Sequence, residues 1–229
     1  MITDKSQPNT ALLKVIKMLA GEIAHFRLQN PDKRLLIGHG SGSFGHAAAI
    51  QHQTHLGGRG EAYWQGFAEV WKAARSLNQI VIDILIEKDL PVVAFPPSAG
   101  IITDNQVVQS WDTHPLRLSL DHNLIPVVQG DVIFDSTLGG TILSTEQIFT
   151  TLAQQLLPQR VLIAGSEQGV FRAPNNPNEI IKHITPSTLN EFLPALSKAN
   201  TTDVTGGMLS KVQWMTVLVQ KIPALEIQA

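Results

Sequence analysis

The stretch Gly38-His39-Gly40-Ser41-Gly42-Ser43-Phe44-Gly45-His46 decides which fold this chain is expected to adopt. It follows Arg34-Leu35-Leu36-Ile37, which predicts a buried strand, and precedes Ala47-Ala48-Ala49, which favours a helix. Glycines permit positive φ angles and a close approach to the backbone, and free amides at a helix N-terminus bind anions. Four glycines and two serines in nine residues exceed what a tight turn requires. We therefore predict a phosphate site here, with a ligand-free strand-to-helix turn as the alternative.

Two better-known glycine motifs fit this turn less well. Gly40-Ser41-Gly42-Ser43-Phe44-Gly45 matches G-x-G-x-x-G, but a dinucleotide site also needs an acidic residue ending a strand about 20 residues on. There the chain reads Gly57-Gly58-Arg59-Gly60-Glu61, a loop entering a helix, which disfavours an oxidoreductase. A P-loop would continue with Lys-Ser or Lys-Thr, whereas His46 stands after the last glycine. A histidine at this place can donate a hydrogen bond to a bound phosphate.

Composition limits the classes of function. The 229 residues carry a net charge of −2, so no broad basic surface for nucleic acid is expected. The absence of cysteine excludes disulfides and thiolate metal sites, and it fits a reducing compartment. No apolar run approaches about 20 residues, and no basic-then-apolar signal is seen at the N-terminus. We therefore expect a cytoplasmic protein without a membrane partner.

Short apolar segments alternate with amphipathic ones along the chain. Helices are predicted over residues 9–28, 62–88, 116–123, 144–157 and 205–219, the fourth opened by a capping box of Ser144 and Gln147. Strands are predicted over residues 34–37, 91–95, 125–129, 132–134, 141–143 and 161–164, with a hairpin between 132–134 and 141–143 and a loop at 174–177. The alternation predicts an α/β fold with a mainly parallel central sheet sandwiched between helices, and ligands at the carboxyl ends of its strands.

A second glycine-containing segment lies near the C-terminus: Asp203-Val204-Thr205-Gly206-Gly207-Met208-Leu209-Ser210-Lys211. Asp203 or Thr205 could cap a helix whose first turn holds two glycines, a place where phosphate can approach closely. Lys211 lies about one helical turn beyond Gly207. By itself the segment could be an ordinary capped helix. Together with the first turn it predicts one site for two phosphate-bearing ligands.

Joined by Ile2-Thr3-Asp4-Lys5 and Gly130-Asp131-Val132, these segments resemble the isopentenyl phosphate kinases of the amino acid kinase superfamily. The resemblance runs in order over nearly the whole chain, and Ser43-Phe44-Gly45-His46 is its most specific part. It implies that a homodimer transfers a phosphoryl group from ATP to isopentenyl phosphate with the help of Mg²⁺.

The resemblance also implies roles for individual residues. His46 would bind the substrate phosphate, Lys5 would stabilise the transferring phosphoryl group, and Lys211 would contact the ATP phosphates. The remaining roles are substrate binding by Ser41, Gly45 and Gly130, and nucleotide binding by Gly42, Gly165, Ser166, Gly206 and Gly207. No residue is assigned as a metal ligand. Residues 1–143 would form a substrate-binding lobe and residues 144–229 a nucleotide-binding lobe of one compact unit. The apolar substrate tail is expected beside Tyr63, Trp64, Phe67, Val70 and Trp71.

The sequence departs from the family pattern in three ways. The family's first strand and its C-terminal strands are expected to be missing. Gly165-Ser166-Glu167-Gln168-Gly169 stands where members often have Thr-Asp-x-Asp-Gly, and Ser144-Thr145-Glu146 replaces a frequent Ser-Gly-Asp, with Glu146 still able to orient lysines. Two alternatives follow: a sister kinase of a phosphonate or another phosphate monoester, resembling a fosfomycin kinase, and a catalytically impaired nucleotide-binding fragment.

Overall fold

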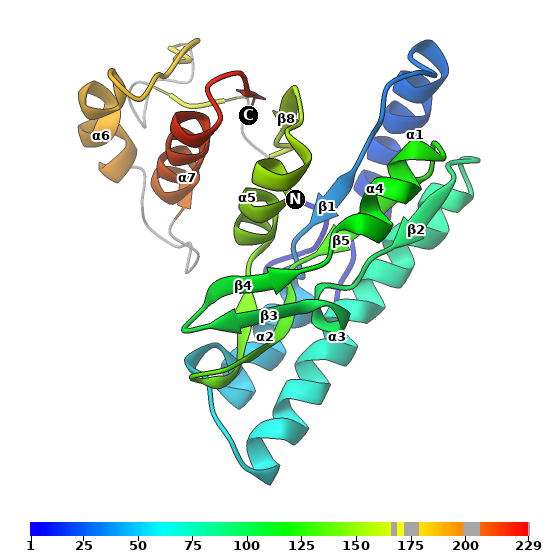
Figure 1. Ribbon diagram of the computed structural model, residues 1–229, viewed down its shortest axis with the longest axis vertical. Coiled ribbons are helices and arrows are strands. Elements are labelled where there is room, and N and C mark those ends of the chain that lie inside the picture. The colour runs from blue at the N-terminus through cyan, green and yellow to red at the C-terminus, as the bar shows by residue number, and fades with distance from the viewer. Residues whose placement is uncertain (166–168, 172–178, 199–206, 229) are drawn as a thin grey trace. The chain divides into compact units, whose positions relative to one another are not determined.

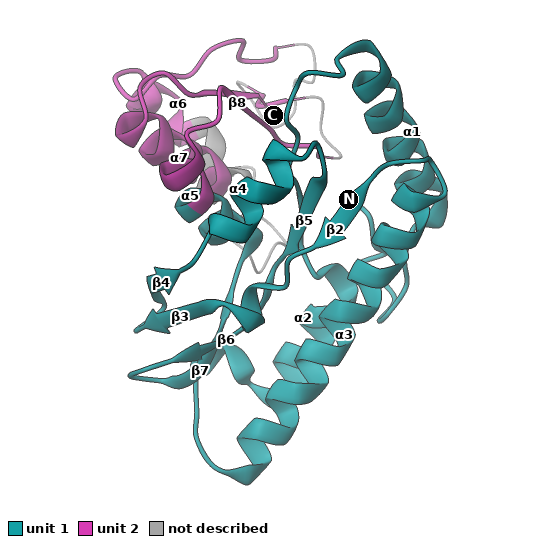
Figure 2. Ribbon diagram, turned by 45° about the vertical axis from the view of Figure 1, so that its right-hand side comes forward, with its two compact units in different colours: residues 1–151 teal, residues 152–229 magenta. Residues whose placement is uncertain are grey.

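The computed structural model in Figure 1 describes residues 1–165, 169–171, 179–198 and 207–228. The chain divides into two compact units, Met1–Thr151 and Leu152–Ala229, which Figure 2 distinguishes by colour. The elements of the first unit are α1 (Leu13–Gln29), β1 (Ile37–His39), α2 (Gly42–His52), η1 (Thr54–Leu56), α3 (Glu61–Ile86), β2 (Val92–Ala94), η2 (Pro97–Ala99), β3 (Ile101–Asp104), β4 (Val107–Trp111), α4 (His114–Asp121), β5 (Ile125–Gln129), β6 (Asp131–Asp135) and β7 (Gly139–Leu143). Helix α5 (Thr145–Leu156) begins in the first unit, and the second continues with β8 (Arg160–Leu162), α6 (Leu189–Lys198), α7 (Gly207–Lys221) and β9 (Glu226–Gln228).

Hydrogen bonds join the described strands into three sheets. The first is parallel, in the order β1-β5-β2, with Ile37 opposite Val127 and Val92 opposite Ile125. The second has the order β4-β3-β6-β7, in which β3 and β6 are parallel and the two outer pairs are antiparallel. The third pairs β8 with β9 in parallel. The predicted α/β class with mainly parallel strands is confirmed, although the strands do not form one continuous sheet.

The core of the first unit lies on β5. All five residues of this strand are buried, as expected for the central strand of a parallel sheet covered on both faces. In Figure 2, α4 lies on one side of this sheet and α1 and α3 lie on the other. Apolar residues at helical spacing on α1 and α3 pack against β5 in one cluster, formed by Ile16, Ala20, Val81, Ile82, Ile84, Leu85, Leu90, Ile125 and Val127.

Helices α2 and α3 lie side by side (Figure 1). Their close approach depends on Gly66, because a Cβ there would lie 2.6 Å from the Cβ of His52. At the solvent side of this contact, His52 Nε2 lies 2.7 Å from Glu69 Oε2. The α2–α3 pair also packs on the second sheet through Ala49, Phe67, Val70 and Val132. The packing of α2 against α3 therefore determines the position of α2, the helix that follows the glycine-rich turn.

The structure corrects several sequence-based assignments. The first strand was predicted at residues 34–37, but β1 begins at Ile37 because it pairs only with the last three residues of β5. The hairpin β3–β4, the helix α6 and the C-terminal strand β9 were not predicted. The hairpin between β6 and β7 and the Ser144–Gln147 capping box are both present. The loop predicted at 174–177 lies outside the described residues.

The second unit has its own small core. Val170, Phe192 and Val212 are buried together, with α6 and α7 packed against each other. Helix α6 carries Pro194 in its interior. Among the residues that the structure describes, no helix is long and apolar enough to cross a membrane.

Candidate active site

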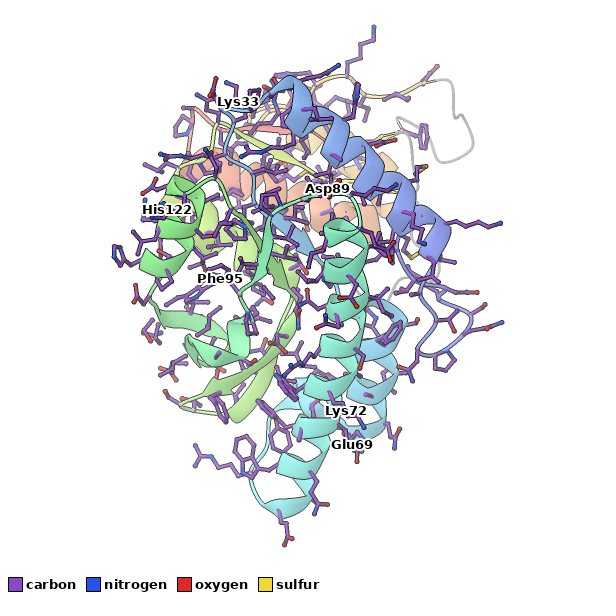
Figure 3. The ribbon with its side chains drawn as sticks, turned by 90° about the vertical axis from the view of Figure 1, so that its right-hand side faces the viewer. Lys33, Glu69, Lys72, Asp89, Phe95 and His122 are labelled. Carbon is purple, nitrogen blue, oxygen red and sulfur yellow. The ribbon has the colours of Figure 1, made fainter. Side chains whose placement is uncertain are left out.

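The glycine-rich turn lies at the carboxyl edge of the parallel sheet. Figure 3 labels residues on either side of this sheet: Lys33, Asp89 and His122 lie near its amino edge, and Phe95, which directly follows β2, lies toward the other edge. Strand β1 ends at His39, and α2 begins at Gly42 after only two residues. Ligands of open parallel sheets bind outside the carboxyl ends of the strands. The turn therefore occupies the position that the sequence predicted for a phosphate site.

Two glycines of the turn cannot be replaced without rearrangement. Gly42 has a φ angle of 51°, which side-chain-bearing residues seldom adopt, and a Cβ there would lie 2.2 Å from Thr3 Oγ1. At Gly45 a Cβ would lie 2.2 Å from Ser41 Oγ. Gly45 also donates its amide to the carbonyl of Ser41 at 3.2 Å, which closes the first turn of α2. The glycines thus allow the helix to start in a tight turn.

The first amides of α2 are partly available to a ligand. The amide of Ser43 donates to Thr3 Oγ1 at 3.1 Å. The amides of Gly42 and Phe44 make no hydrogen bond to any residue within the described ranges. Ser41, the residue before the helix, does not cap it through its side chain. Two unpaired amides at the positive end of a helix are suited to an anion.

The turn is joined to β5 and α5 through the carbonyl of His39. This oxygen accepts hydrogen bonds from the amide of Gly130 at 3.1 Å and from Thr145 Oγ1 at 2.8 Å. A Cβ at Gly130 would lie 3.3 Å from Thr145 Oγ1, so the two segments are in close contact. Phe149 of α5 covers Gly38, where a Cβ would lie 2.1 Å from its ring. Gly130 therefore lies beside the glycine-rich turn, and its role in substrate binding stays a prediction.

Asp131 ties the turn after β2 to the same edge. Its side chain is 2% exposed, and its two oxygens accept hydrogen bonds from the amides of Ser98 at 3.2 Å and Val132 at 2.9 Å. Burial raises the pKa of this carboxyl to about 6, against the opposing effect of hydrogen bonds from the Ser98 side chain, the Ser98 amide and the Val132 amide. Hydrogen bonds thus connect the segments at the carboxyl ends of β1, β5 and β2.

Asp135 holds the two hairpins of the second sheet. Burial alone would raise the pKa of its carboxyl, but hydrogen bonds lower it to about 2. The donors are the amides of Asn105, Gln106, Thr137 and Leu138 and the hydroxyl of Thr103. Asn105 and Gln106 both have positive φ angles, as in the tight hairpin turns of antiparallel strands. Asp135 therefore has a structural role away from the glycine-rich turn.

His46 and Lys5 lie on two segments that meet at the start of α2. His46 is exposed on the first turns of the helix, and its ring makes no hydrogen bond to a residue that the structure describes. Lys5 is exposed in a turn whose neighbour Thr3 lies against Gly42. His39, by contrast, is within hydrogen-bond distance of the Gly40 carbonyl and the Asn78 side chain, and burial lowers its pKa. Of the two turn histidines, only His46 is available to an anion.

Apart from Gly42, which lies in the first unit, the predicted nucleotide-binding residues belong to the second unit. Gly165 follows β8, Gly207 is the first residue of α7, and Lys211 lies on α7 about one turn later, partly buried. Ser166 and Gly206 lie outside the described residues. The structure thus places Ser41, Gly42, Gly45, His46 and Gly130 in one region of the first unit, and the roles of these residues stay predictions, as do the nucleotide-binding assignments.

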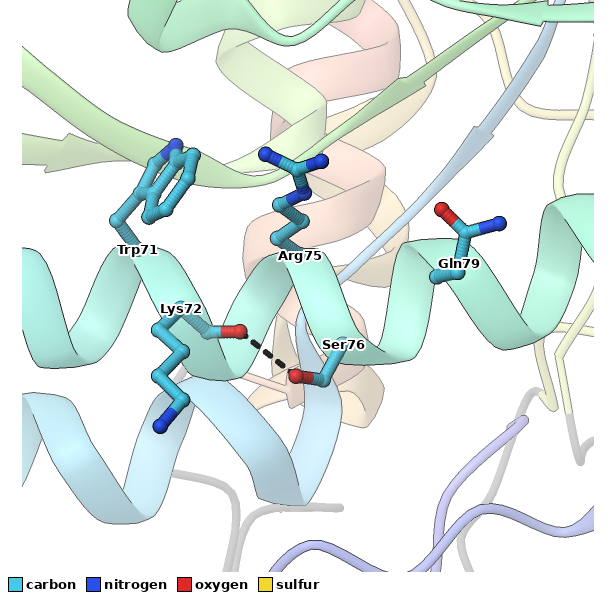
Figure 4. A pocket seen from close by; sticks show the side chains of 5 residues that line it. All are labelled: Trp71, Lys72, Arg75, Ser76 and Gln79. Carbon is cyan, nitrogen blue, oxygen red and sulfur yellow. Dashed lines mark hydrogen bonds between the residues drawn. The ribbon is translucent and has the colours of Figure 1, made fainter.

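The residues expected beside the substrate tail separate into two groups. Phe67 and Val70 are buried core residues, whereas Tyr63, Trp64 and Trp71 are only partly buried. Trp71 is covered by the guanidinium of Arg75, 5.2 Å from the ring centroid. It borders a surface depression of about 390 Å³, with Lys72, Arg75, Ser76 and Gln79 as the other lining residues (Figure 4). This depression is formed by one face of α3 and contains none of the predicted phosphate-binding residues.

Exposed aromatic surface remains beside α3. The ring of Phe134 on β6 lies 5.9 Å from Trp64 and 5.2 Å from Phe67, centroid to centroid. Phe134 is 51% exposed, and its parallel neighbour Ile102 is 50% exposed. Trp64, Phe134 and Ile102 therefore offer apolar surface that sequence reasoning assigned only in part.

Sequence reasoning missed three residues that shape the site: Thr3, Thr145 and Asp131. Thr3 and Thr145 bond to backbone groups 40 and 106 positions away, so no local pattern points to their partners. Asp131 lies in the noted Gly130-Asp131-Val132 segment, and an acidic residue among buried strand residues is the signal that could have identified it.

Comparison with known proteins gives the family. Residues 1–225 match the amino acid kinase family. The isopentenyl phosphate kinase of Methanocaldococcus jannaschii is 32% identical over 93% of this chain and 82% of its own length, and that of Methanothermobacter thermautotrophicus is 31% identical over 82% and 73%. A crystal structure of isopentenyl phosphate kinase superposes with a TM-score of 0.75 at 27% identity, covering 96% of this chain and 84% of that one. The chain belongs to the amino acid kinase family, and within it resembles the isopentenyl phosphate kinases.

Proposed function

We propose that this protein is an ATP-dependent kinase that converts isopentenyl phosphate into isopentenyl diphosphate. The observation that carries the proposal is the start of α2, where the amides of Gly42 and Phe44 and the side chain of His46, none of them bonded to a described residue, lie at a tight glycine turn. The curated relatives that match over most of this chain are isopentenyl phosphate kinases. An acceptor that already bears a phosphate suits an anion site at a helix N-terminus.

The chemistry requires positioning and charge neutralisation more than covalent catalysis. In phosphoryl transfer the attacking and leaving oxygens lie in line, and charge spreads over the equatorial oxygens of the transferred group. Holding both reactants in line supplies on the order of 7–11 kcal/mol of the barrier. The α2 amides and His46 would fix the acceptor phosphate. Lys5, on the segment that Thr3 attaches to α2, would neutralise the transferring phosphoryl group.

ATP would bind through the second unit. Gly207 at the start of α7 allows phosphate to approach its amides, and Lys211 can contact the same phosphates from the next turn. Within the described residues no group of three or more His, Asp or Glu side chains forms a metal cluster. A Mg²⁺ ion carried on nucleotide phosphates needs only one or two protein carboxylates. Mg²⁺ would neutralise charge on the β- and γ-phosphates.

The isopentenyl tail would contact the exposed aromatic surface of Trp64 and Phe134. Both rings lie on elements adjoining the glycine turn, since α3 packs on α2 and β6 begins directly after Gly130. Covering such apolar surface contributes roughly 25 cal/mol per Å². The protein is further proposed to act as a cytoplasmic homodimer. Sedimentation analysis tests the dimer, which a monomer at micromolar concentration would rule out.

The test is an assay of the purified protein with ATP, Mg²⁺ and isopentenyl phosphate, in which the diphosphate product is detected directly. His46→Gln removes the imidazole and is expected to lower kcat/KM for isopentenyl phosphate by about 100-fold, the effect of losing one aimed donor. His55→Gln is the matched control, since His55 is also exposed and lies on η1 in the same unit. Absence of diphosphate from the unsubstituted protein would reject the proposed reaction.

Two other functions make different predictions. A sister kinase would phosphorylate a phosphonate such as fosfomycin, or another phosphate monoester, with higher kcat/KM than isopentenyl phosphate in a matched panel. A catalytically impaired nucleotide-binding domain would bind ATP in calorimetry without turnover on any acceptor. The altered segment 165–169 favours this second alternative, and measurable turnover excludes it.

A further inference from the structure

Thr3 is a buried polar residue to which the proposed reaction assigns no role. Its side chain is 1% exposed, although the loop residues from Lys5 to Asn9 are exposed. An isolated antiparallel bridge pairs Thr3 with Ala11. On either side of this bridge the amide of Asp4 donates to the Thr10 carbonyl and that of Leu12 donates to the Ile2 carbonyl, each at 2.9 Å. Residues 4–10 therefore form a closed loop whose base is Thr3.

Thr3 acts as the cap that α2 lacks in its own sequence. Helices usually begin with a side-chain oxygen from the residue before the first turn, but Ser41 makes no such bond. Thr3 Oγ1 instead accepts the amide of Ser43, 40 positions along the chain. The space for it exists only because residue 42 is glycine, since a Cβ there would lie 2.2 Å from Thr3 Oγ1 and 2.7 Å from Thr3 Cγ2. Thr3 and Gly42 fit each other as a pair.

The loop based on Thr3 carries Lys5. Asp4 Oδ1 accepts hydrogen bonds from both the amide and the hydroxyl of Ser6, at 2.8 and 2.7 Å, which fixes the turn around Lys5. Lys5 is two residues from Thr3, so their Cα atoms are at most ~7 Å apart. Thr3 accepts the Ser43 amide, while the amides of Gly42 and Phe44, which bond to no residue that the structure describes, could bind phosphate. One hydroxyl thus joins the loop of the lysine to the anion-binding turn.

We propose that Thr3 is a positioning residue, which holds Lys5 at the N-terminus of α2 so that lysine and helix amides act on the same phosphoryl transfer. This inference rests on the proposed kinase function. Displacing a catalytic group by about 1 Å can cost about 100-fold in rate. Removing the Thr3 hydroxyl should therefore lower kcat far more than it weakens substrate binding.

The experiment compares Thr3→Val with Thr3→Ser in steady-state kinetics with isopentenyl phosphate, ATP and Mg²⁺. Thr3→Val keeps the shape of the side chain without its oxygen and is expected to lower kcat by 10- to 100-fold, with KM values changed less than about three-fold. Thr3→Ser keeps the oxygen and should retain at least half of the activity. Thr10→Val is the matched control, because Thr10 lies in the same loop and its hydroxyl donates to the nearby Pro8 carbonyl at 3.0 Å.

A double-mutant cycle separates positioning from general packing. In a Lys5→Met background, Thr3→Val should lower the remaining kcat by less than about two-fold, since the group that it positions is gone. An equal loss in both backgrounds, or a loss that Thr3→Ser does not rescue, would overturn the proposal. Hydrogen exchange gives a readout independent of turnover: Thr3→Val should speed exchange at the Asp4 and Ser43 amides, and unchanged exchange would also overturn it. Failure of the kinase function itself would appear separately, as inactivity of the unsubstituted protein.

Discussion

The buried carboxyl of Asp131 makes the stability of the first unit depend on pH. Its pKa is raised from the ordinary value of 3.8 to about 6 by burial. A folded-state pKa above the unfolded value means that the native protein binds the proton more tightly. The stability from this group is therefore fully present below about pH 4 and is lost as pH rises through 6. Each pKa unit is worth about 1.4 kcal/mol, so the total change is roughly 3 kcal/mol.

The substitution Asp131→Asn isolates this effect, because asparagine has a similar shape and does not titrate. We expect the unfolding free energy of the unsubstituted protein minus that of the variant to fall by roughly 2–3 kcal/mol between pH 4 and pH 7.5. Urea unfolding followed by tryptophan fluorescence measures the difference, since Trp64, Trp71 and Trp111 all report on the first unit. A carboxyl resonance of Asp131 titrating near pH 6 would give the same pKa directly.

Asp135→Asn provides the internal control for this experiment. Hydrogen bonds lower the pKa of Asp135 to about 2 in spite of its burial, so its stabilising effect is lost only as pH falls from about 4 through 2. The corresponding free-energy difference should stay flat between pH 4 and pH 7.5. A flat curve for Asp131→Asn, or one that rises with pH, would refute the argument from burial.

Two further predictions concern the glycine turn and the nucleotide side. Gly42→Ala places a side chain at a φ angle of 51° and against Thr3, and it should lower the unfolding free energy by roughly 1–2 kcal/mol in urea titrations. Gly21→Ala on α1, where a Cβ meets nothing within 4 Å, is its control and should cause no loss. Lys211→Met removes a charge from α7 and should lower kcat/KM for ATP about 100-fold while phosphate binding at α2, measured by calorimetry, stays unchanged. Weakened phosphate binding in that variant would contradict the division of roles.

The fold class could be predicted because hydrophobic periodicity reflects burial directly. Strand β5 was placed at residues 125–129, as observed, since a fully buried central strand reads as a continuous apolar run. The hairpin β3–β4 was missed because its strands are short, mixed in polarity and held by Asp135 from another strand. The prediction for β1 was wrong in its bounds for a related reason. Pairing with β5 determines where β1 begins and ends, and the apolar residues before Ile37 have no pairing partner on β5.

The sequence by itself determined that a glycine-rich turn lies between a strand and a helix, the place where we predict a phosphate site. The glycines, the serines and the histidine at the end of the turn act through the local backbone. Their pattern can therefore be recognised in the sequence alone. Only the tertiary structure decided what surrounds the turn. Thr3 caps α2 from outside, Thr145 and Gly130 meet at the His39 carbonyl, and Asp131 fixes the turn after β2. Each of these contacts joins residues far apart in the chain, and long-range pairing depends on how the elements pack rather than on neighbouring residues.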